Sequence, residues 1–212
     1  MKLYLKNARL NFTASLFEPK TGPNGQGKAK FGVVSLIDGK TRAFLGDMNP
    51  DSENGRAANL QWGDPKEAIT AAVIAAAKAK WPANYQDVIK QLKAADRLPV
   101  HDGDAKADKP GYEGTLFING SNEVRPQVTN SSTGAQLEAK DGVIYSGCRA
   151  YVTLDIWPQD NQYGKRVNAS LLMVSFLGDD ERISGGATAT ADDYAAIPDT
   201  PSKSKAGAAS LF

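Results

Sequence analysis

The chain has 212 residues, of which 41% are hydrophobic and 23% are charged, and its formal net charge is +1. This length and composition fit one domain with a hydrophobic core and exclude global disorder, and the near-neutral charge argues against a protein that coats duplex DNA by charge alone. No apolar run approaches the roughly 20 residues of a membrane-spanning helix, and the N-terminal segment lacks the apolar stretch of a signal peptide. We therefore expect a cytoplasmic protein.

Charge is unevenly distributed along the chain. From Gly178 to Phe212 the sequence has six acidic and three basic residues, which leaves a net charge of +4 on the rest. After about Ser184 the composition shifts to Gly, Ala, Ser, Thr, Asp and Pro, which is typical of a disordered segment. We therefore expect a folded, mildly basic domain over residues 1–183 and a flexible acidic tail over residues 184–212.

The first part of the chain has the pattern of strands separated by turns. We expect a first strand or hairpin and two further strands in the segments Lys2–Phe17, Phe31–Ile37 and Thr41–Leu45. Between the first two lies a loop rich in glycine and proline that ends in two lysines, Lys28 and Lys30. This loop is either a solvated hairpin tip or a flexible basic arm that closes over a phosphate backbone.

A pair of helices is predicted next. Asp64 and Pro65 are typical of a helix start, because aspartate caps free backbone N–H groups and proline fits the first turn. The alanine-rich segment Lys66–Trp81 and the amphipathic segment Ala83–Ala95 then predict two helices. We expect this insertion, about residues 64–96, to support the sheet, with its tryptophan in the core.

The polar segment Leu98–Gly111 holds the single histidine of the chain, His101, with three aspartates nearby. Imidazole and carboxylate groups can ligate metals, but the spacing matches neither a zinc nor a calcium site, so we expect a solvated loop. The single cysteine, Cys148, has the pattern of a small buried residue. No motif for a nucleophile, a phosphate loop or a dinucleotide is present, and we expect no catalytic residues, metal or cofactor.

The most informative segment is Val143–Trp157, in which two kinds of residue alternate over about a dozen positions. One parity, from Ile144 to Ile156, is almost entirely apolar and belongs on a core. The other parity carries three aromatic side chains and an arginine: Tyr145, Arg149, Tyr151 and Trp157. Exposed aromatic rings stack on unpaired bases, and arginine binds phosphate or stacks in turn. The alternative is that these rings pack against another part of the protein.

Two neighbouring segments add further candidates. Tyr112–Asn119 predicts a strand in which Phe117 faces away from its aliphatic neighbours. A hairpin loop with Tyr163 near its tip then leads into the last predicted strand, Val167–Leu177. Both segments therefore place aromatic side chains outside the predicted core.

Three short motifs occur in the later half of the chain: KPGYEG at Lys109–Gly114, YSGC at Tyr145–Cys148, and the turn Gly164-Lys165. Together they resemble the tailed-phage single-stranded DNA-binding proteins of the family catalogued as domain of unknown function 2815. The similarity covers Lys109–Gly186 well and the N-terminal strands loosely. It implies a mainly β protein with an OB-fold, a five-stranded Greek-key barrel, that binds single-stranded DNA without sequence preference. Such proteins act in phage DNA replication or recombination in the cytoplasm of the infected bacterium.

The resemblance implies a DNA-binding groove on the aromatic face. The DNA-binding residues that we expect are Tyr145, Arg149, Tyr151, Trp157, Lys109, Tyr112, Phe117, Arg125, Tyr163, Lys165 and Arg166. Lys28 and Lys30 are expected to close over the groove. The resemblance does not decide whether duplex DNA is bound as well. In the acidic tail, Asp192, Asp193 and Phe212 are expected to dock phage or host replication proteins, unless the tail is only a solvated end.

Two other classes of function stay open at this point. A structural or assembly β protein would use the aromatic face as an oligomer interface, and its association would hardly respond to salt. A nuclease would hold a divalent metal with carboxylates alone and would consume its DNA. A single-strand binder differs from both, because its affinity falls steeply with salt and its DNA stays intact.

Overall fold

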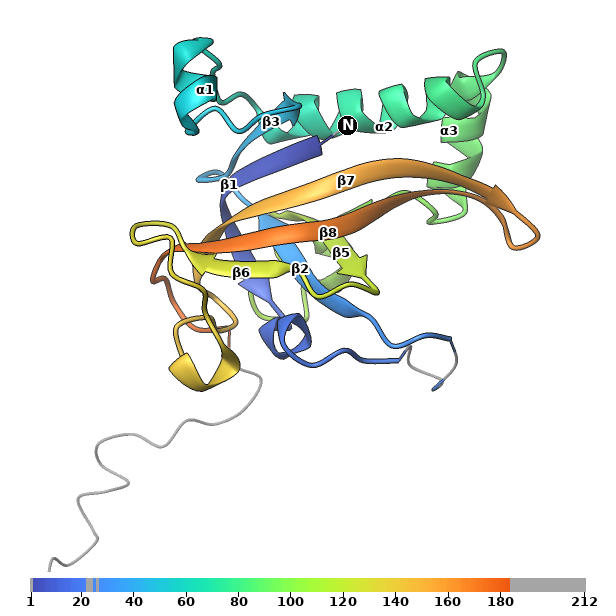
Figure 1. Ribbon diagram of the computed structural model, residues 1–212. Coiled ribbons are helices and arrows are strands. Elements are labelled where there is room, and N and C mark those ends of the chain that lie inside the picture. Colours follow the sequence, from blue (N-terminus) through green and yellow to red (C-terminus); the bar gives the residue numbers. More distant parts are fainter. Residues whose placement is uncertain (1, 22–24, 26, 184–212) are drawn as a thin grey trace, which may run out of the picture.

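The structure is a computed structural model that describes residues 2–21, 25 and 27–183. The expected tail over residues 184–212, with its candidates Asp192, Asp193 and Phe212, lies outside the described residues. The described chain is mainly β, with a helical insertion between β3 and β4 (Figure 1). No helix in this part of the chain has the length and apolar character needed to cross a membrane.

Five strands form a ring (Figure 1). In chain order they are β1 (Lys2–Asn11), β2 (Phe31–Ile37), β5 (Leu116–Asn122), β7 (Arg149–Asn161) and β8 (Gly164–Gly178). Antiparallel pairing joins them in the order β5–β2–β1–β7–β8, and a parallel contact between Ser121 and Ser170 joins β8 back to β5. The short strands β3 (Arg42–Gly46), β4 (Val100–Asp102) and β6 (Gln127–Asn130) pair with β1, β5 and β8. Single 3₁₀ turns lie in the connections: η1 (Thr13–Leu16), η2 (Gly103–Lys106) and η3 (Ala139–Asp141).

The inner face of the ring is the hydrophobic core. Along β7, Ala150, Val152, Leu154 and Ile156 are all at most 5% exposed, and aliphatic side chains of the other ring strands pack against them. Cys148, just before β7, is fully buried in the same core. The predicted core parity and the buried thiol are therefore confirmed, because alternate side chains of a strand point to opposite faces of a sheet.

Three α-helices lie between β3 and β4: α1 (Glu53–Ala57), α2 (Pro65–Lys80) and α3 (Tyr85–Ala94). α2 begins where the sequence predicts, because the Asp64 carboxylate accepts hydrogen bonds from the backbone N–H groups of Lys66 and Glu67. It packs against β3 and β7 (Figure 1). Trp81, just after α2, is 7% exposed and donates its indole N–H to Asp160 at 2.9 Å. The helical insertion and the core position of Trp81 are therefore confirmed.

The predicted start of the strand Val143–Trp157 is wrong. The strand expected from Val143 begins at Arg149. Gly147 interrupts the alternation with a left-handed φ of +116°, and a Cβ at this position would clash with the carbonyl oxygen of Glu181. Only glycine adopts such a conformation in so little space. Because the strand starts after this glycine, Tyr145 does not share a sheet face with the aromatic residues of β7.

The segment Leu98–Gly111 is a solvated loop only in its later part, where most of residues 104–110 are exposed. Its residues Val100–Asp102 form β4 along β5, and the His101 ring stacks on Phe117 with 5.0 Å between ring centroids. Nδ1 of this histidine lies 2.9 Å from a carboxylate oxygen of Asp96. An edge strand, an aromatic contact and a carboxylate partner therefore account for the single histidine.

Candidate nucleic-acid interface

A continuous groove runs over the outer face of β2, β5 and β8. It consists of two adjoining cavities of about 590 and 540 Å³. The first lies beside the connection from β1 to β2, and the second lies beside the β7–β8 hairpin. Both are lined by Lys30, Asn119, Ser121 and Glu123, so the two cavities meet at these residues. This surface is called the β2–β5 groove below.

The floor of the β2–β5 groove is low and carries two polar side chains, Asn119 and Ser121. Gly32 pairs with Ser121 and Val34 pairs with Asn119, so these four residues share the outer face of the sheet. Asn119 and Ser121 are exposed, and the glycine adds no side chain that would raise the floor. A glycine inside a strand often marks a place where a ligand approaches the backbone closely. The floor can therefore receive an extended ligand with hydrogen-bonding groups.

Exposed aromatic side chains lie in both parts of the groove. Phe12, 57% exposed, lines the first cavity, and Trp157, 38% exposed, lines the second. Phe12 has a φ of +57°, and β1, the strand within the segment Lys2–Phe17 that was expected to hold a strand or hairpin, ends just before it at Asn11. This conformation is uncommon for a bulky residue and concentrates at functional sites. The indole N–H of Trp157 donates to the Ser170 hydroxyl at 2.8 Å, which fixes the orientation of the ring.

Among the residues that the structure describes, four cationic side chains line the groove: Lys20, Lys28, Lys30 and Arg166. The backbones of Lys20 and Lys30 pair reciprocally, with N–O distances of 2.9 and 3.0 Å, which holds the base of the β1–β2 connection together. The connection and the β7–β8 hairpin extend toward the same side of the molecule, at the right of Figure 1. Cations beside exposed rings suit an anionic ligand with flat groups.

Two of the predicted DNA-binding residues, Trp157 and Arg166, line the groove. Tyr163 is 75% exposed near the tip of the β7–β8 hairpin, outside both cavities. The ammonium group of Lys165 lies 5.6 Å from the centre of the Trp81 ring, on the helical side of the hairpin. Lys165 and Arg166 thus have different surroundings, because neighbouring side chains of a strand point to opposite faces of the sheet.

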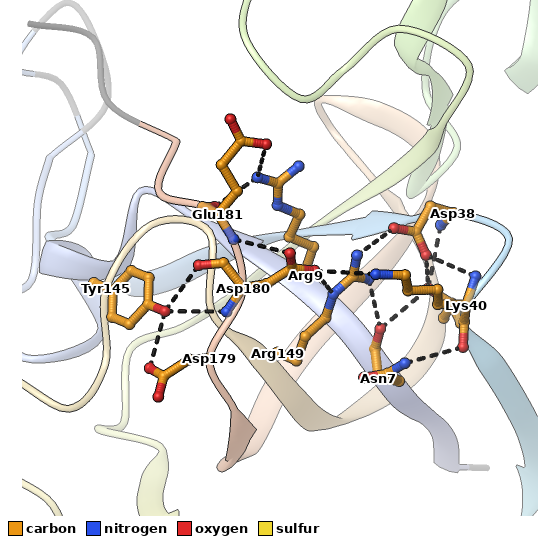
Figure 2. A network of polar contacts seen from close by, with 10 residues as sticks. Asn7, Arg9, Asp38, Lys40, Tyr145, Arg149, Asp179, Asp180 and Glu181 are labelled. Atoms are coloured by element: carbon orange, nitrogen blue, oxygen red, sulfur yellow. Dashed lines mark hydrogen bonds and ion pairs between the residues drawn. The ribbon is translucent and has the colours of Figure 1, made fainter.

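Arg149 and Tyr145 belong to a network of polar contacts outside the groove (Figure 2). Arg149 is 6% exposed, and its guanidinium donates to Asp180 at 2.6 Å and to the backbone oxygen of Asn7 at 3.0 Å. The same group lies 2.7 Å from a carboxylate oxygen of Asp38. The Tyr145 hydroxyl accepts a hydrogen bond from the backbone N–H of Asp180 at 3.1 Å. The expected exposure of Arg149 is therefore wrong: this arginine ties the segment after β8 to β1 and to the β2–β3 turn.

The polar network predicts acid sensitivity. Hydrogen bonds from the backbone N–H of Glu181 and from Arg149 lower the pKa of Asp180 from its ordinary value of 3.8 to about 2. The unfolded chain takes up this proton first on acidification, so the stability that the carboxylate contributes is complete above pH 3.8 and is lost as the pH falls toward about 2. Urea denaturation should therefore give free energies of unfolding for wild type and Asp180→Asn that converge over this window. A difference that stays constant with pH would contradict the assignment.

Two predicted aromatic residues are buried. Tyr112 and Phe117 are 2% and 3% exposed and pack edge to face, with 5.1 Å between ring centroids. Leu36 and Ile183 complete this small cluster on the outer side of β2 and β5. Phe117 does face away from its aliphatic neighbours, but the cluster covers it. The expected exposure of both rings is therefore wrong, because strand parity indicates a face and not what covers that face.

Three further predicted residues lie outside the groove. Tyr151 packs against Trp62, and its hydroxyl donates to Asp51 at 2.7 Å, so it holds the segment around α1 against the ring. Lys109 is exposed in the turn before β5. Arg125 forms an ion pair of 2.6 Å with the glutamate that precedes η3. None of these three side chains lines either cavity.

The sequence reasoning missed Phe12, Lys20, Asn119 and Ser121 as residues of the groove. The two polar residues carried a usable signal, because they alternate with inward-facing residues along β5. The sequence gives no such signal for Phe12, because it has the parity of the buried Leu10. Only its left-handed backbone turns the ring outward.

An outer sheet face with a basic groove and exposed aromatic rings is the type of surface that single-stranded nucleic-acid-binding proteins use. The chain belongs to the family of the single-stranded DNA-binding protein of Enterobacter phage Enc34, whose family model matches residues 1–204. This membership confirms the resemblance to phage single-stranded DNA-binding proteins and the expectation of a non-enzymatic class.

Individual relatives agree with the family. The chain is 33% identical over 198 residues to putative protein p50 of Acyrthosiphon pisum secondary endosymbiont phage 1, and the match covers 92% of both chains. It is similar to the solved structure of the single-stranded DNA-binding protein from bacteriophage Enc34 in complex with single-stranded DNA. That match has a TM-score of 0.61 and 26% identity and covers 86% of this chain and 89% of that one. A C-terminal truncation of the Enc34 protein matches with a TM-score of 0.61 and 26% identity, over 85% of this chain and 87% of that one.

Proposed function

We propose that this protein binds single-stranded DNA in the β2–β5 groove, without sequence preference, and acts in phage DNA replication or recombination in the cytoplasm of the infected cell. The observation that carries the proposal is the presence, in one groove, of four cations and the exposed rings of Phe12 and Trp157. The solved complex of the Enc34 protein with single-stranded DNA supports the same class of ligand.

The order of the strands supports an OB-fold for the ring. Numbered along the chain, the five ring strands pair as first, second, third, fifth, fourth and back to first. OB-folds bind oligonucleotides on the face of their second and third strands, between the loop that joins the first two strands and the loop that joins the last two. In this chain those elements are β2, β5, the β1–β2 connection and the turn of the β7–β8 hairpin. The β2–β5 groove lies among these four elements.

The contents of the groove suit binding that is independent of sequence. Lysine and arginine contact phosphates, which every nucleotide carries, and aromatic rings stack on bases, each of which has a π-face. Each stacked ring contributes about 1–3 kcal/mol. Neither type of contact reads the edge of a base, so the strand binds whatever its sequence.

The alternative of an oligomer interface on one continuous aromatic face loses its basis. Tyr145 bonds to the segment after β8, and Tyr151 bonds to the segment around α1. Of the aromatic residues predicted on that face, Trp157 is the exposed one. One exposed ring does not make an apolar interface, and the lysine and arginine that line the same cavity, Lys30 and Arg166, favour a nucleic-acid ligand over a protein surface.

Fluorescence anisotropy with a labelled oligo-dT of about 30 nucleotides, long enough for one OB-fold site, tests the proposed function. We expect binding that weakens with salt and that unlabelled duplex of equal length displaces poorly. Absence of binding at low salt would contradict the proposal. If duplex DNA displaced the oligonucleotide as well as single strands do, the protein would bind nucleic acid without preferring single strands.

Two neighbouring cations provide a matched test of the groove. The logarithm of the affinity for single strands falls with the logarithm of salt by about 0.7 for each neutralised phosphate. We therefore expect Arg166→Ala, in the groove, to reduce this slope by about 0.7. Lys165→Ala, beside Trp81 on the other face of the hairpin, should leave it unchanged. An equal effect of both substitutions would contradict the position of the groove.

A further inference from the structure

We infer that Glu123 is an affinity-limiting residue of the β2–β5 groove, because its carboxylate occupies a lysine that would otherwise bind DNA phosphate. This inference rests on the proposed function. It assigns to one side chain the role of an internal competitor: the strand enters the groove by displacing the carboxylate from Lys28.

The position of Glu123 is the first observation. It follows directly after β5 and lines both cavities, at the place where they meet. Its carboxylate lies 2.9 Å from the ammonium group of Lys28, which comes from the β1–β2 connection. The ion pair therefore joins two walls of the groove that are 95 residues apart in the sequence.

The exposure of the pair is the second observation. The side chains of Lys28 and Glu123 are 78% and 49% exposed, so water and an incoming ligand reach both charges. Exposed ion pairs contribute little to stability, and a phosphate offers the lysine the same charge as the carboxylate. The contact is thus easily exchanged, in contrast to the buried pairs of Arg149.

The charges around Glu123 are the third observation. The hydrogen bond from Lys28 lowers the pKa of Glu123, and the charge of Lys30 lowers it further. The carboxylate raises the pKa of Lys28 in turn. Glu123 is therefore ionised at neutral pH and faces two of the four cations of the groove.

Displacing the Glu123 carboxylate from Lys28 lowers the measurable affinity for DNA. When phosphate takes Lys28, the freed carboxylate stays beside the DNA, where it repels phosphate and takes up a cation from solution. The affinity is lower, and its dependence on salt is shallower, than four cations alone would give. Glu123 would thereby keep a bound strand releasable.

The test is a double-mutant cycle on single-stranded DNA affinity. Glu123→Gln keeps the shape of the side chain and removes its charge. We expect it to tighten binding of labelled oligo-dT about 5- to 20-fold at low salt and to steepen the salt slope by about 0.7. When Lys28 is already replaced by alanine, Glu123→Gln should increase the affinity by less than half of that 5- to 20-fold factor. Glu67→Gln, an exposed carboxylate on α2 away from the groove, serves as the control for net charge.

The outcomes separate this inference from the proposed function. If the wild type does not bind oligo-dT, the proposed function itself fails. If the wild type binds and Glu123→Gln binds no more tightly than Glu67→Gln, the inference is overturned while the function stands. An equal gain with and without Lys28 would also overturn it, because the carboxylate would then act only through general repulsion.

Discussion

Replacing both Phe12 and Trp157 with alanine should abolish detectable binding of single-stranded DNA at moderate salt and leave the melting temperature close to that of the wild type. Each stacked ring contributes about 1–3 kcal/mol, which is a factor of roughly 5 to 150 in affinity. Both side chains are exposed, 57% and 38%, so their removal opens no cavity in the core. Anisotropy with oligo-dT and a thermal melt of the same samples measure the two effects.

Two controls accompany the double variant. Met48→Ala removes another exposed apolar side chain, 40% exposed, that lines neither cavity of the groove, and it should leave DNA affinity unchanged. Phe12→Gly removes the ring and also suits the left-handed backbone, so it should lose affinity without losing stability. A large fall in melting temperature with unchanged DNA affinity would mean that the two rings are structural.

Arg149→Met should show the opposite pattern, with a loss of about 3–5 kcal/mol in the free energy of unfolding, because two carboxylates lose the cation that they share inside the protein. The guanidinium is the common partner of Asp38 and Asp180, at 2.7 and 2.6 Å, and the residue is 6% exposed. Urea denaturation measures the loss. DNA affinity at a temperature where the variant is folded should stay within about twofold of the wild type, which is less than 0.5 kcal/mol.

The matched control is Arg125→Met, which removes an arginine from an exposed ion pair with Glu138. Exposed pairs contribute about 0–1 kcal/mol, so this substitution should change stability little. If Arg149→Met instead unfolded no more readily than Arg125→Met and lost its DNA affinity, the arginine would be a DNA ligand, as the sequence pattern first predicted.

Much of the fold could be predicted from local patterns. The alternation through Ala150, Val152 and Leu154 predicted a core strand, and these residues are buried in β7. Asp64 followed by proline predicted the start of α2, and the carboxylate caps the helix as expected. Such predictions succeed because the period of the pattern and the chemistry of the cap are properties of a few neighbouring residues.

The candidate site was harder to predict, because exposure depends on contacts that are distant in sequence. Phe117 has the parity of an exposed residue, but Tyr112 and Ile183 cover it. Arg149 has the same kind of parity, but it bonds to Asp180, 31 residues later. Periodicity reports the face of a strand, whereas these outcomes depend on which segments return to that face.

The remaining groove residues could not be predicted because their backbone conformation follows no periodic pattern. Phe12 follows the parity of a buried residue until its left-handed φ turns it outward. The lysines of the β1–β2 connection lie in a segment of glycine and proline, where no periodicity indicates a direction. The strand pairing that brings Lys30 beside β5 is a long-range feature, and the groove exists only once it has formed.

The most direct test of the central claim is to map where single-stranded DNA touches the protein. Oligo-dT containing 5-iodo-deoxyuridine, cross-linked by light and analysed by mass spectrometry of the digested protein, reports aromatic side chains in contact with bases. The account predicts cross-links at Phe12 and Trp157, the exposed rings of the β2–β5 groove. Cross-links at Tyr145 or Tyr151 without any in the groove would contradict it.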